Sequence, residues 1–321
     1  MLKITRILVT KTPLAFLIRQ SKHWRLPGFE GIPLYDVVKF FIQQLKTHGL
    51  TERAAAISYN FIMAIPPSLL FLLTLVPNLP FISKGSLKTQ LHTLIRDIVP
   101  AREYNSGIIE FVDNFLNSSP IGLLSFGLLL SLFFASNGMM GIIRSFNKKY
   151  MGFENLTGLQ KRGRALQLTI FIFGLVLAYL LLLIMQGALL KWIVVDKSWR
   201  DFIKYFRWGM MLLLLFFIIG FIFKYAPAVS RRWRLINPGS VLTTTLCIIS
   251  SLGFAVFVSN FGRYNALYGS IGTIMMIMAL IFINSLSLLI GFELNVSIRS
   301  VKAAALQREQ QEKADMEAKK V

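Results

Sequence analysis

The chain has 321 residues, of which 55% are hydrophobic, and it carries 35 Lys and Arg against 15 Asp and Glu, a net charge of +20. Its mean hydropathy of +0.59 is too high for a soluble domain of this length, in which about half of the residues would carry polar, solvated side chains. The composition therefore argues against an ordinary soluble protein and favours one whose solvent is lipid.

Six apolar stretches without charged side chains follow one another along the chain. Each is close to or above the roughly 20 residues that a helix needs to cross about 30 Å of hydrocarbon, so we expect an all-α bundle of six transmembrane helices. The expected spans are about 54–76, 121–143, 165–190, 208–225, 238–260 and 271–294. They divide the chain into a basic cytoplasmic arm (1–34), a membrane domain with interfacial amphipathic helices (35–298) and a charged cytoplasmic tail (299–321).

Basic residues gather on one side of these spans. Nine Lys and Arg occur up to Arg53, six in 144–164, four in 224–234 and six from Arg299 onward, against ten in the segments on the other side. The positive-inside rule makes the richer side cytoplasmic and therefore places both termini there. Anionic lipid head groups then account for the charge, and we expect membrane lipids and no nucleic acid as partners.

Two segments outside the spans have amphipathic patterns. Residues 35–47 predict a helix that either lies in the cytoplasmic interface or packs on other cytoplasmic loops. Residues 78–119 predict two short helices, separated by Pro100, that cover the outer mouth of the bundle. Asn237 is a plausible N-cap with Pro238 at the first helical position, and the charged tail reads as a solvated helix or as disorder.

No pattern for metal or nucleotide chemistry occurs in the sequence. The three histidines, His23, His48 and His92, fall on two different sides of the membrane, and the single cysteine, Cys247, lies in the middle of a span. Neither a zinc-hydrolase motif nor a phosphate-binding loop is found. We expect no enzyme activity, no cofactor and no metal.

Polar residues and prolines mark the first span. Tyr59 and Asn60 precede Pro66 and Pro67, and two consecutive prolines remove backbone donors in mid-helix, which should kink or break it. A break at that depth would line a cavity. The alternative is a kink accommodated by packing, with Tyr59 and Asn60 bonded across helices.

In the last span Asn284, Ser287, Gly291 and Asn295 recur at intervals that place them on one helical face. This face is either a polar pathway or a packing seam of small residues, which is the commoner use of such residues. The high cost of unpaired polar groups in hydrocarbon favours a hydrated cavity in which this face meets Tyr59, Asn60 and the proline break.

Glu293 lies at the cytoplasmic end of the same helix. Arg144, at the cytoplasmic end of the second span, is the nearest plausible partner by topology. An ion pair between these two residues is more consistent with a position near the membrane boundary than a proton-relay carboxylate, which belongs at the midplane.

The turn between the last two spans is rich in glycine, asparagine and tyrosine, and a shorter segment of this kind, Ser136-Asn137-Gly138, interrupts the second span. The chain is similar to the YihY/BrkB family of bacterial inner-membrane proteins over about residues 35–298. The residues that carry this resemblance are Ala54-Ala55-Ala56 with Tyr59, Arg231-Arg232-Trp233-Arg234, Pro238-Gly239, the hairpin residues Ser259, Asn260, Phe261, Gly262, Tyr264, Asn265, Tyr268, Gly269 and Ser270, and Gly291, Glu293, Leu294 and Asn295.

The resemblance implies a six-helix protein of the bacterial cytoplasmic membrane. Members of the family are discussed as envelope or virulence factors and as transporters, and the family has carried a ribonuclease BN label. This sequence offers that label no catalytic site. We therefore expect a protein that moves or organises a lipid-like envelope amphiphile without its own ATPase. The alternative is a non-transporting scaffold for envelope assembly, and a membrane-bound ribonuclease comes last.

The charge asymmetry predicts where reporter enzymes fused to the chain are active. A fusion after Val321 should report a cytoplasmic location, and a fusion within 78–119 should report the opposite side of the membrane, because the basic segments resist translocation. Alkaline phosphatase and green fluorescent protein fusions measure the two locations. An external C-terminus would contradict the topology.

Overall fold

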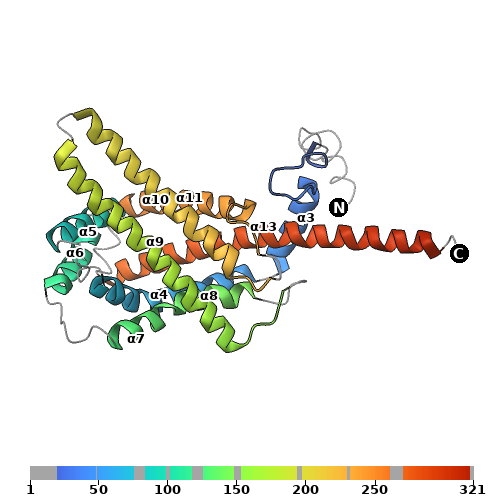
Figure 1. Ribbon diagram of the computed structural model, residues 1–321, viewed down its shortest axis with the longest axis horizontal. Helices are drawn as coiled ribbons and strands as arrows, with labels where there is room; N and C mark the ends of the chain where they lie inside the picture. Colours follow the sequence, from blue (N-terminus) through green and yellow to red (C-terminus); the bar gives the residue numbers. More distant parts are fainter. Residues whose placement is uncertain are drawn as a thin grey trace.

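The computed structural model describes residues 20–47, 49–75, 84–98, 102–117, 126–147, 153–193, 197–229, 232–260 and 270–318. These ranges hold helices and one isolated β-bridge, between Phe153 and Val229, so the predicted all-α class is confirmed. In chain order the helices are α3 (Leu34–Thr47), α4 (Leu50–Leu75), α5 (Lys84–Ile98), α6 (Arg102–Asn117), α7 (Phe126–Ala135), α8 (Asn137–Phe146), α9 (Gly158–Ile193), α10 (Lys197–Tyr225), α11 (Pro238–Asn260) and α13 (Ser270–Ala318) (Figure 1).

Six segments within the described ranges are long and apolar enough to cross a membrane, as the sequence predicts. Five of them lie on single helices, and the second spans α7 and α8 together. Their bounds are Leu50–Leu72, Leu129–Phe146, Gly158–Leu182, Trp208–Tyr225, Pro238–Phe257 and Ile274–Met316.

The largest apolar core joins the spans at the end of the bundle from which α13 emerges. Its buried members include Ile57 of α4, Ile143 of α8, Leu168 of α9, Phe223 of α10 and Leu289 of α13. Beyond this core α13 continues as a single helix of 49 residues and projects out of the bundle (Figure 1). The charged tail is therefore a solvated helix, which was one of the two predicted alternatives.

Helix α3 packs on α13 and on the segment that precedes it in the chain, as one of the two predicted alternatives has it. Val37 is fully buried in a small cluster with Phe29, Ile32 and Ile298, while Val38 and Ile42, on another side of α3, are exposed. The burial of one side and the exposure of apolar residues on another are typical of a helix that packs on protein and also contacts lipid at the membrane surface.

The two prolines do not break α4, which runs without interruption from Leu50 to Leu75. The predicted break is therefore wrong. Proline is tolerated inside membrane helices where neighbouring helices and hydroxyl side chains compensate for the lost backbone donors. Here α7, α8 and α13 all contact α4, and the Ser68 hydroxyl donates to the carbonyl of Ala64 at 2.6 Å, next to the prolines.

The interruption predicted at Ser136 is present, since α7 ends at Ala135 and α8 begins at Asn137. Ser136 keeps a helical backbone conformation, and its hydroxyl donates to the carbonyl of Phe133 at 2.7 Å. The second span therefore consists of two short helices joined at a single residue.

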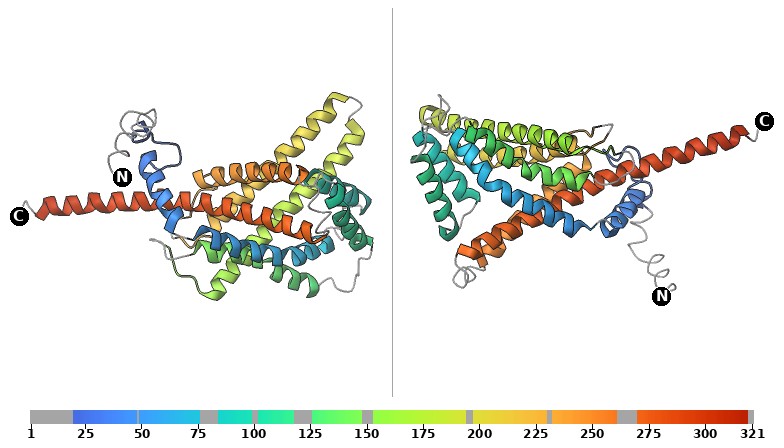
Figure 2. Two further views of the ribbon diagram at one scale, coloured as in Figure 1. Left: turned by 180° about the vertical axis from the view of Figure 1, so that it is seen from behind. Right: turned by 90° about the horizontal axis from the view of Figure 1, so that it is seen from below.

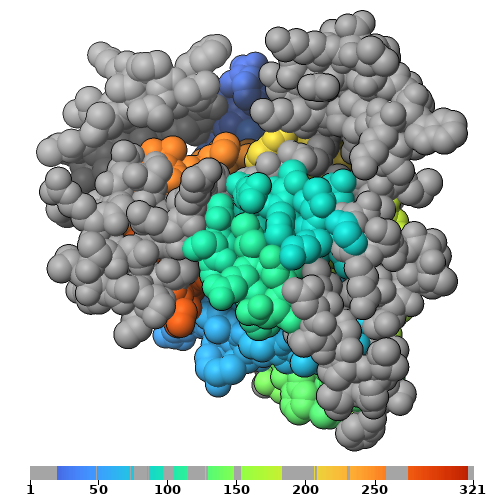
Figure 3. Space-filling model, turned by 90° about the vertical axis from the view of Figure 1, so that its left-hand side faces the viewer, coloured from blue at the N-terminus to red at the C-terminus, as the bar shows by residue number. Residues whose placement is uncertain are grey.

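Helices α5 and α6 form the predicted amphipathic pair. Leu87 of α5, Val112 of α6 and Leu180 of α9 are buried together, which fixes the pair to α9. In the right-hand view of Figure 2, α4 and α13 separate toward the end of the molecule that bears this pair. Figure 3 looks at that end and shows α5 and α6 at its centre. The helix pair therefore covers the end of the bundle at which the spans diverge.

The contact between α11 and α13 depends on two glycines that face each other, Gly239 and Gly291. A Cβ atom on Gly291 would overlap the carbonyl of Gly239 and the hydroxyl of Thr243. Small residues of this kind allow two membrane helices to approach until their backbones touch. The start of α11 at this contact is fixed by the predicted cap, because Asn237 Oδ1 accepts from the Ser240 amide at 2.8 Å.

Replacement of Gly291 by alanine should destabilise the protein by about 1–3 kcal/mol, the usual cost of overpacking. The matched control is Gly253→Ala in α11, where a Cβ would meet nothing within 4 Å and where alanine is the better helix former. Thermal unfolding in detergent micelles measures both variants. Equal melting temperatures for the two variants would contradict the close contact.

Candidate functional site

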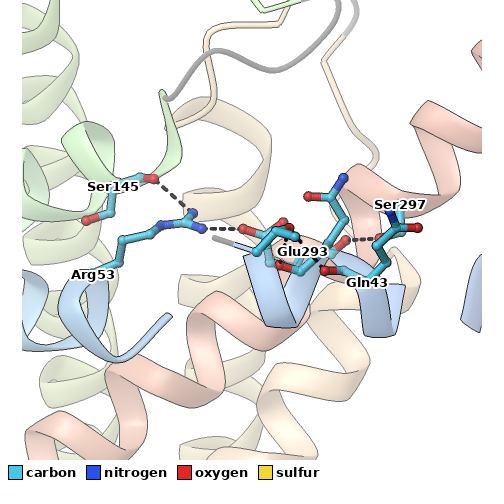
Figure 4. Close-up of polar contacts among 7 residues, drawn as sticks. Gln43, Arg53, Ser145, Glu293 and Ser297 are labelled. Carbon is cyan, nitrogen blue, oxygen red and sulfur yellow. Dashed lines mark hydrogen bonds and ion pairs between the residues drawn. The ribbon is translucent and has the colours of Figure 1, made fainter. Parts of the chain in front are cut away.

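A buried ion pair joins three helices at the end of the bundle from which α13 emerges. Arg53 of α4 is 3% exposed and Glu293 of α13 is fully buried, and Arg53 Nη1 pairs with Glu293 Oε1. Arg53 Nη2 donates to the Ser145 carbonyl of α8 at 2.9 Å. Figure 4 shows the guanidinium extended between these two partners. The Glu293 carbonyl, in turn, accepts from the Ser297 hydroxyl at 2.7 Å.

Aromatic rings enclose this pair. The rings of Phe146 and Phe292 are stacked with their centroids 3.9 Å apart, and the guanidinium carbon of Arg53 lies 5.9 Å from the centroid of Phe292. Trp233 packs against Phe292 from the segment that precedes α11. Charges act on each other more strongly among such apolar rings than in water, and an uncompensated charge there is correspondingly unfavourable.

The prediction that Glu293 pairs with Arg144 is wrong. Arg144 is exposed, and the carboxylate pairs with Arg53. Both arginines lie at cytoplasmic ends of predicted spans, so topology alone did not distinguish them. One signal in the sequence does favour Arg53, because it directly precedes the span-forming run Ala54-Ala55-Ala56, whose small side chains let a neighbouring helix approach.

Tyr59 and Asn60 do not face the polar residues of α13. Tyr59 is 60% exposed, and the Asn60 amide donates to the Ala56 carbonyl of its own helix at 2.7 Å. The Asn60 side chain lies against Gly141 of α8. One position before Tyr59, Ser58 does face α13, and its hydroxyl lies 3.3 Å from the hydroxyl of Ser285.

The face of α13 that carries Asn284, Ser287 and Gly291 contacts α11. The Ser250 hydroxyl donates to Asn284 Oδ1 at 3.1 Å, and the Thr243 hydroxyl donates to the Ser287 carbonyl at 3.4 Å. The structure therefore separates this face from Tyr59 and Asn60 and places it in a packed helix contact.

Asn295 completes the contact at the start of α11. Its Oδ1 accepts from the Gly239 amide at 2.9 Å, and its Nδ2 donates to Asn237 Oδ1 at 2.7 Å. One amide side chain of α13 thus joins the capping residue and the first turn of α11. These contacts correspond to a packing seam of small residues, which was one of the two interpretations that the sequence left open.

The family-motif hairpin lies outside the part of the chain that the structure describes in full. Ser259 and Asn260 end α11, but their side chains are not described, and neither are residues 261–269, which include Gly262, Tyr264, Asn265, Tyr268 and Gly269. Their expected role in the outer turn stays a prediction.

A second charged group links α5 and α6 at the other end of the molecule. Asp113 lies 2.7 Å from His92 Nε2 and 3.1 Å from Lys88 Nζ. Burial acts to raise the pKa of Asp113, but the hydrogen bonds and positive charges of His92 and Lys88 outweigh it and lower the pKa below its ordinary value. The carboxylate therefore stays ionised and connects the two helices.

Within the described ranges, no group of three or more His, Cys, Asp or Glu side chains could hold a metal ion. The chemistry that this part of the chain offers is electrostatic and apolar: a buried ion pair at one end, a charged link on α5 and α6 at the other, and hydrogen-bonded helix contacts between them.

Comparison with known proteins agrees with the architecture and with the motif residues. The family described as virulence factor BrkB matches residues 41–317, which is most of the sequence. The chain belongs to the BrkB family. This match confirms the resemblance that the sequence carries at Gly291, Glu293 and the start of α11. Arg53 and Glu293 both lie inside the matched region.

Curated relatives cover nearly the whole length. The chain is 30% identical over 276 residues to YfkH of Bacillus subtilis strain 168, a protein named as ribonuclease-like, which covers 83% of this chain and 96% of the relative. It is 22% identical over 302 residues to a UPF0761 membrane protein of Tolumonas auensis, covering 90% of this chain and 94% of the relative. No solved structure matches the chain significantly.

Removal of either member of the buried pair should be strongly destabilising. Arg53→Ala leaves the Glu293 carboxylate buried without its ion-pair partner, which typically costs about 3–5 kcal/mol. The double variant Arg53→Met with Glu293→Leu should cost less than the sum of the single changes, because neither charge remains. Unfolding in detergent, followed by circular dichroism, measures this coupling.

The matched control is Arg144→Ala, which removes an exposed arginine from the neighbouring helix and should change stability by no more than about 0.5 kcal/mol. Strict additivity of the Arg53 and Glu293 changes would contradict the pairing.

Proposed function

We propose that this BrkB-family protein moves or organises a lipid-like amphiphile of the cell envelope, in the bacterial cytoplasmic membrane and with both termini in the cytoplasm. The observation that carries the proposal is the change in burial along α13. Most residues from Ser285 to Ile298 are buried, whereas every residue from Ile274 to Ile283 is exposed or only partly buried. The helix is therefore enclosed by protein at one end and much more exposed at the other.

The chemistry of the open part favours an apolar occupant. Residues 274–283 of α13 and 252–257 of α11 carry only apolar side chains and one glycine. Such walls suit acyl chains and offer no ligand to an ion. The amphipathic pair α5 and α6 lies at the same end and adds polar groups, among them Lys88 and Asp113. An amphiphile has the matching combination of an apolar and a polar part.

A non-transporting scaffold is the second candidate. The polar side chains of α13 that the sequence suggested as a pathway are hydrogen-bonded within the α11 contact. A scaffold has no need of a hydrated path, so this observation favours it. In that case lipid, or another protein, covers the exposed part of α13 and stays there.

We infer that neither function requires catalysis by this chain. The ribonuclease-like name belongs to the Bacillus relative, and RNA hydrolysis would require an acid and a base placed about a phosphodiester. Three groups in the described part of the chain bring a carboxylate to a cationic side chain: Arg53 with Glu293, Asp113 with His92 and Lys88, and the exposed pair of Lys302 with Glu30. The first two lie at opposite ends of the bundle, and the third has no second acid or base beside it in a described ion pair. The first two do not touch each other, and the first is sealed from solvent.

Reconstitution tests the movement of lipid directly. Vesicles that carry a trace of fluorescent phosphatidylethanolamine are treated with dithionite, which quenches only the outer leaflet. The protein should accelerate loss of the protected signal by about tenfold or more over protein-free vesicles, which corresponds to a barrier lowered by about 1.4 kcal/mol.

The variant Met278→Trp should slow this exchange several-fold, because it adds bulk to the open part of α13. The control Leu306→Trp makes the same kind of change at a similarly exposed position in the projecting part of α13 and should leave the rate unchanged. If the unmodified protein leaves the rate at the protein-free level, movement of lipid is excluded and the scaffold remains.

A further inference from the structure

Arg162 of α9 is held against the interruption in the second span. Its Nη1 donates to Asn137 Oδ1 at 2.8 Å, and its Nη2 donates to the Phe133 carbonyl at 2.6 Å. The guanidinium carbon lies 3.6 Å from the centroid of the Phe133 ring. The carbonyl end of α7 carries a partial negative charge, and Arg162 compensates it in part.

A second arginine stands near this one. Arg144 follows Asn137, the partner of Arg162, by seven residues on α8, so Asn137 and Arg144 lie on one face of that helix, and the Arg144 side chain is exposed. Across the described ranges neither arginine has a carboxylate within ion-pair distance, in contrast to Arg53, Lys88 and Lys302. Two positive charges are thus brought together without an anion to balance them.

The surface next to these arginines is apolar. Four residues of α7 are exposed: Leu129, Leu130, Phe133 and Phe134. This helix begins the second span, so these side chains lie at the depth of the hydrocarbon, and Arg162 stacks on the innermost part of that surface. A positive pair bordered by exposed apolar residues matches an anionic head group with acyl chains below it.

We propose that Arg144 and Arg162 bind the phosphate group of an anionic phospholipid at the cytoplasmic face. Guanidinium groups fit phosphate oxygens because their N–H groups form a planar fork that can donate two parallel hydrogen bonds, and a second arginine adds another positive charge and further donors. Arg162 is the fixed member of the site, and Arg144 is the adjustable one. The site does not depend on lipid movement, since a phospholipid bound here can remain in place.

The test uses the full-length protein in detergent and native mass spectrometry. The ligands are phosphatidylglycerol, zwitterionic phosphatidylcholine and inorganic phosphate, which separates a lipid phosphate from a free one. Arg144→Gln should weaken phosphatidylglycerol binding about fivefold, the effect of one basic residue at an anionic membrane surface, and leave phosphatidylcholine unchanged. Because Arg144 is exposed, the variant should melt at the same temperature as the parent without added lipid.

The matched control is Arg234→Gln, which removes an exposed arginine from another basic segment. It should leave phosphatidylglycerol affinity unchanged. Equal losses in the two variants would show charge attraction without a site and overturn the proposal. Inorganic phosphate that binds as tightly as phosphatidylglycerol would overturn the assignment to a lipid. Neither result bears on the lipid exchange assay, which measures movement and not head-group binding.

Discussion

The ion pair between Arg53 and Glu293 constrains the bundle in a way that apolar packing does not. Apolar contacts are not directional and can be remade with other apolar neighbours, but two charges withdrawn from water must stay in contact with each other. The pair therefore fixes the height of α4 against α13, and the bond from Arg53 to the Ser145 carbonyl fixes α8 at the same level. The rings of Phe146 and Phe292 stack next to the pair at the same level.

The remaining polar contacts follow outward from this point along antiparallel helices. Ser58 meets Ser285 on one side of α13, and on the other side the contacts with α11 pass from Asn295 through Thr243 to Ser250. The hydrocarbon of the membrane offers no hydrogen-bond donors or acceptors. A hydroxyl or amide in this region is therefore tolerated only where a neighbouring residue hydrogen-bonds to it. This explains why the polar residues of α13 lie within helix contacts and not along a hydrated cavity.

The sequence predicts those features that depend on residues close to one another along the chain. The six spans follow from apolar length, and the cap at Asn237 follows from local side-chain chemistry. Partners in space were harder to predict, because one residue along a helix turns a side chain by about 100°. Ser58 thus faces α13 while Tyr59 is exposed and Asn60 faces α8. The effect of Pro66 and Pro67 depended in the same way on neighbours that no local pattern reveals.

The separation of polar and apolar chemistry along α13 limits what the end of the bundle that bears α5 and α6 can accommodate. The polar contacts between α11 and α13 among the described residues extend outward as far as Ser250 and Asn284. Beyond them, residues 274–283 offer neither donors nor acceptors from their side chains. A hydrated solute there would lose its water without replacement, which is strongly unfavourable. An acyl chain loses nothing by the same transfer. Transporter and scaffold therefore share one physical requirement, an apolar neighbour on this surface, and they differ only in whether that neighbour exchanges.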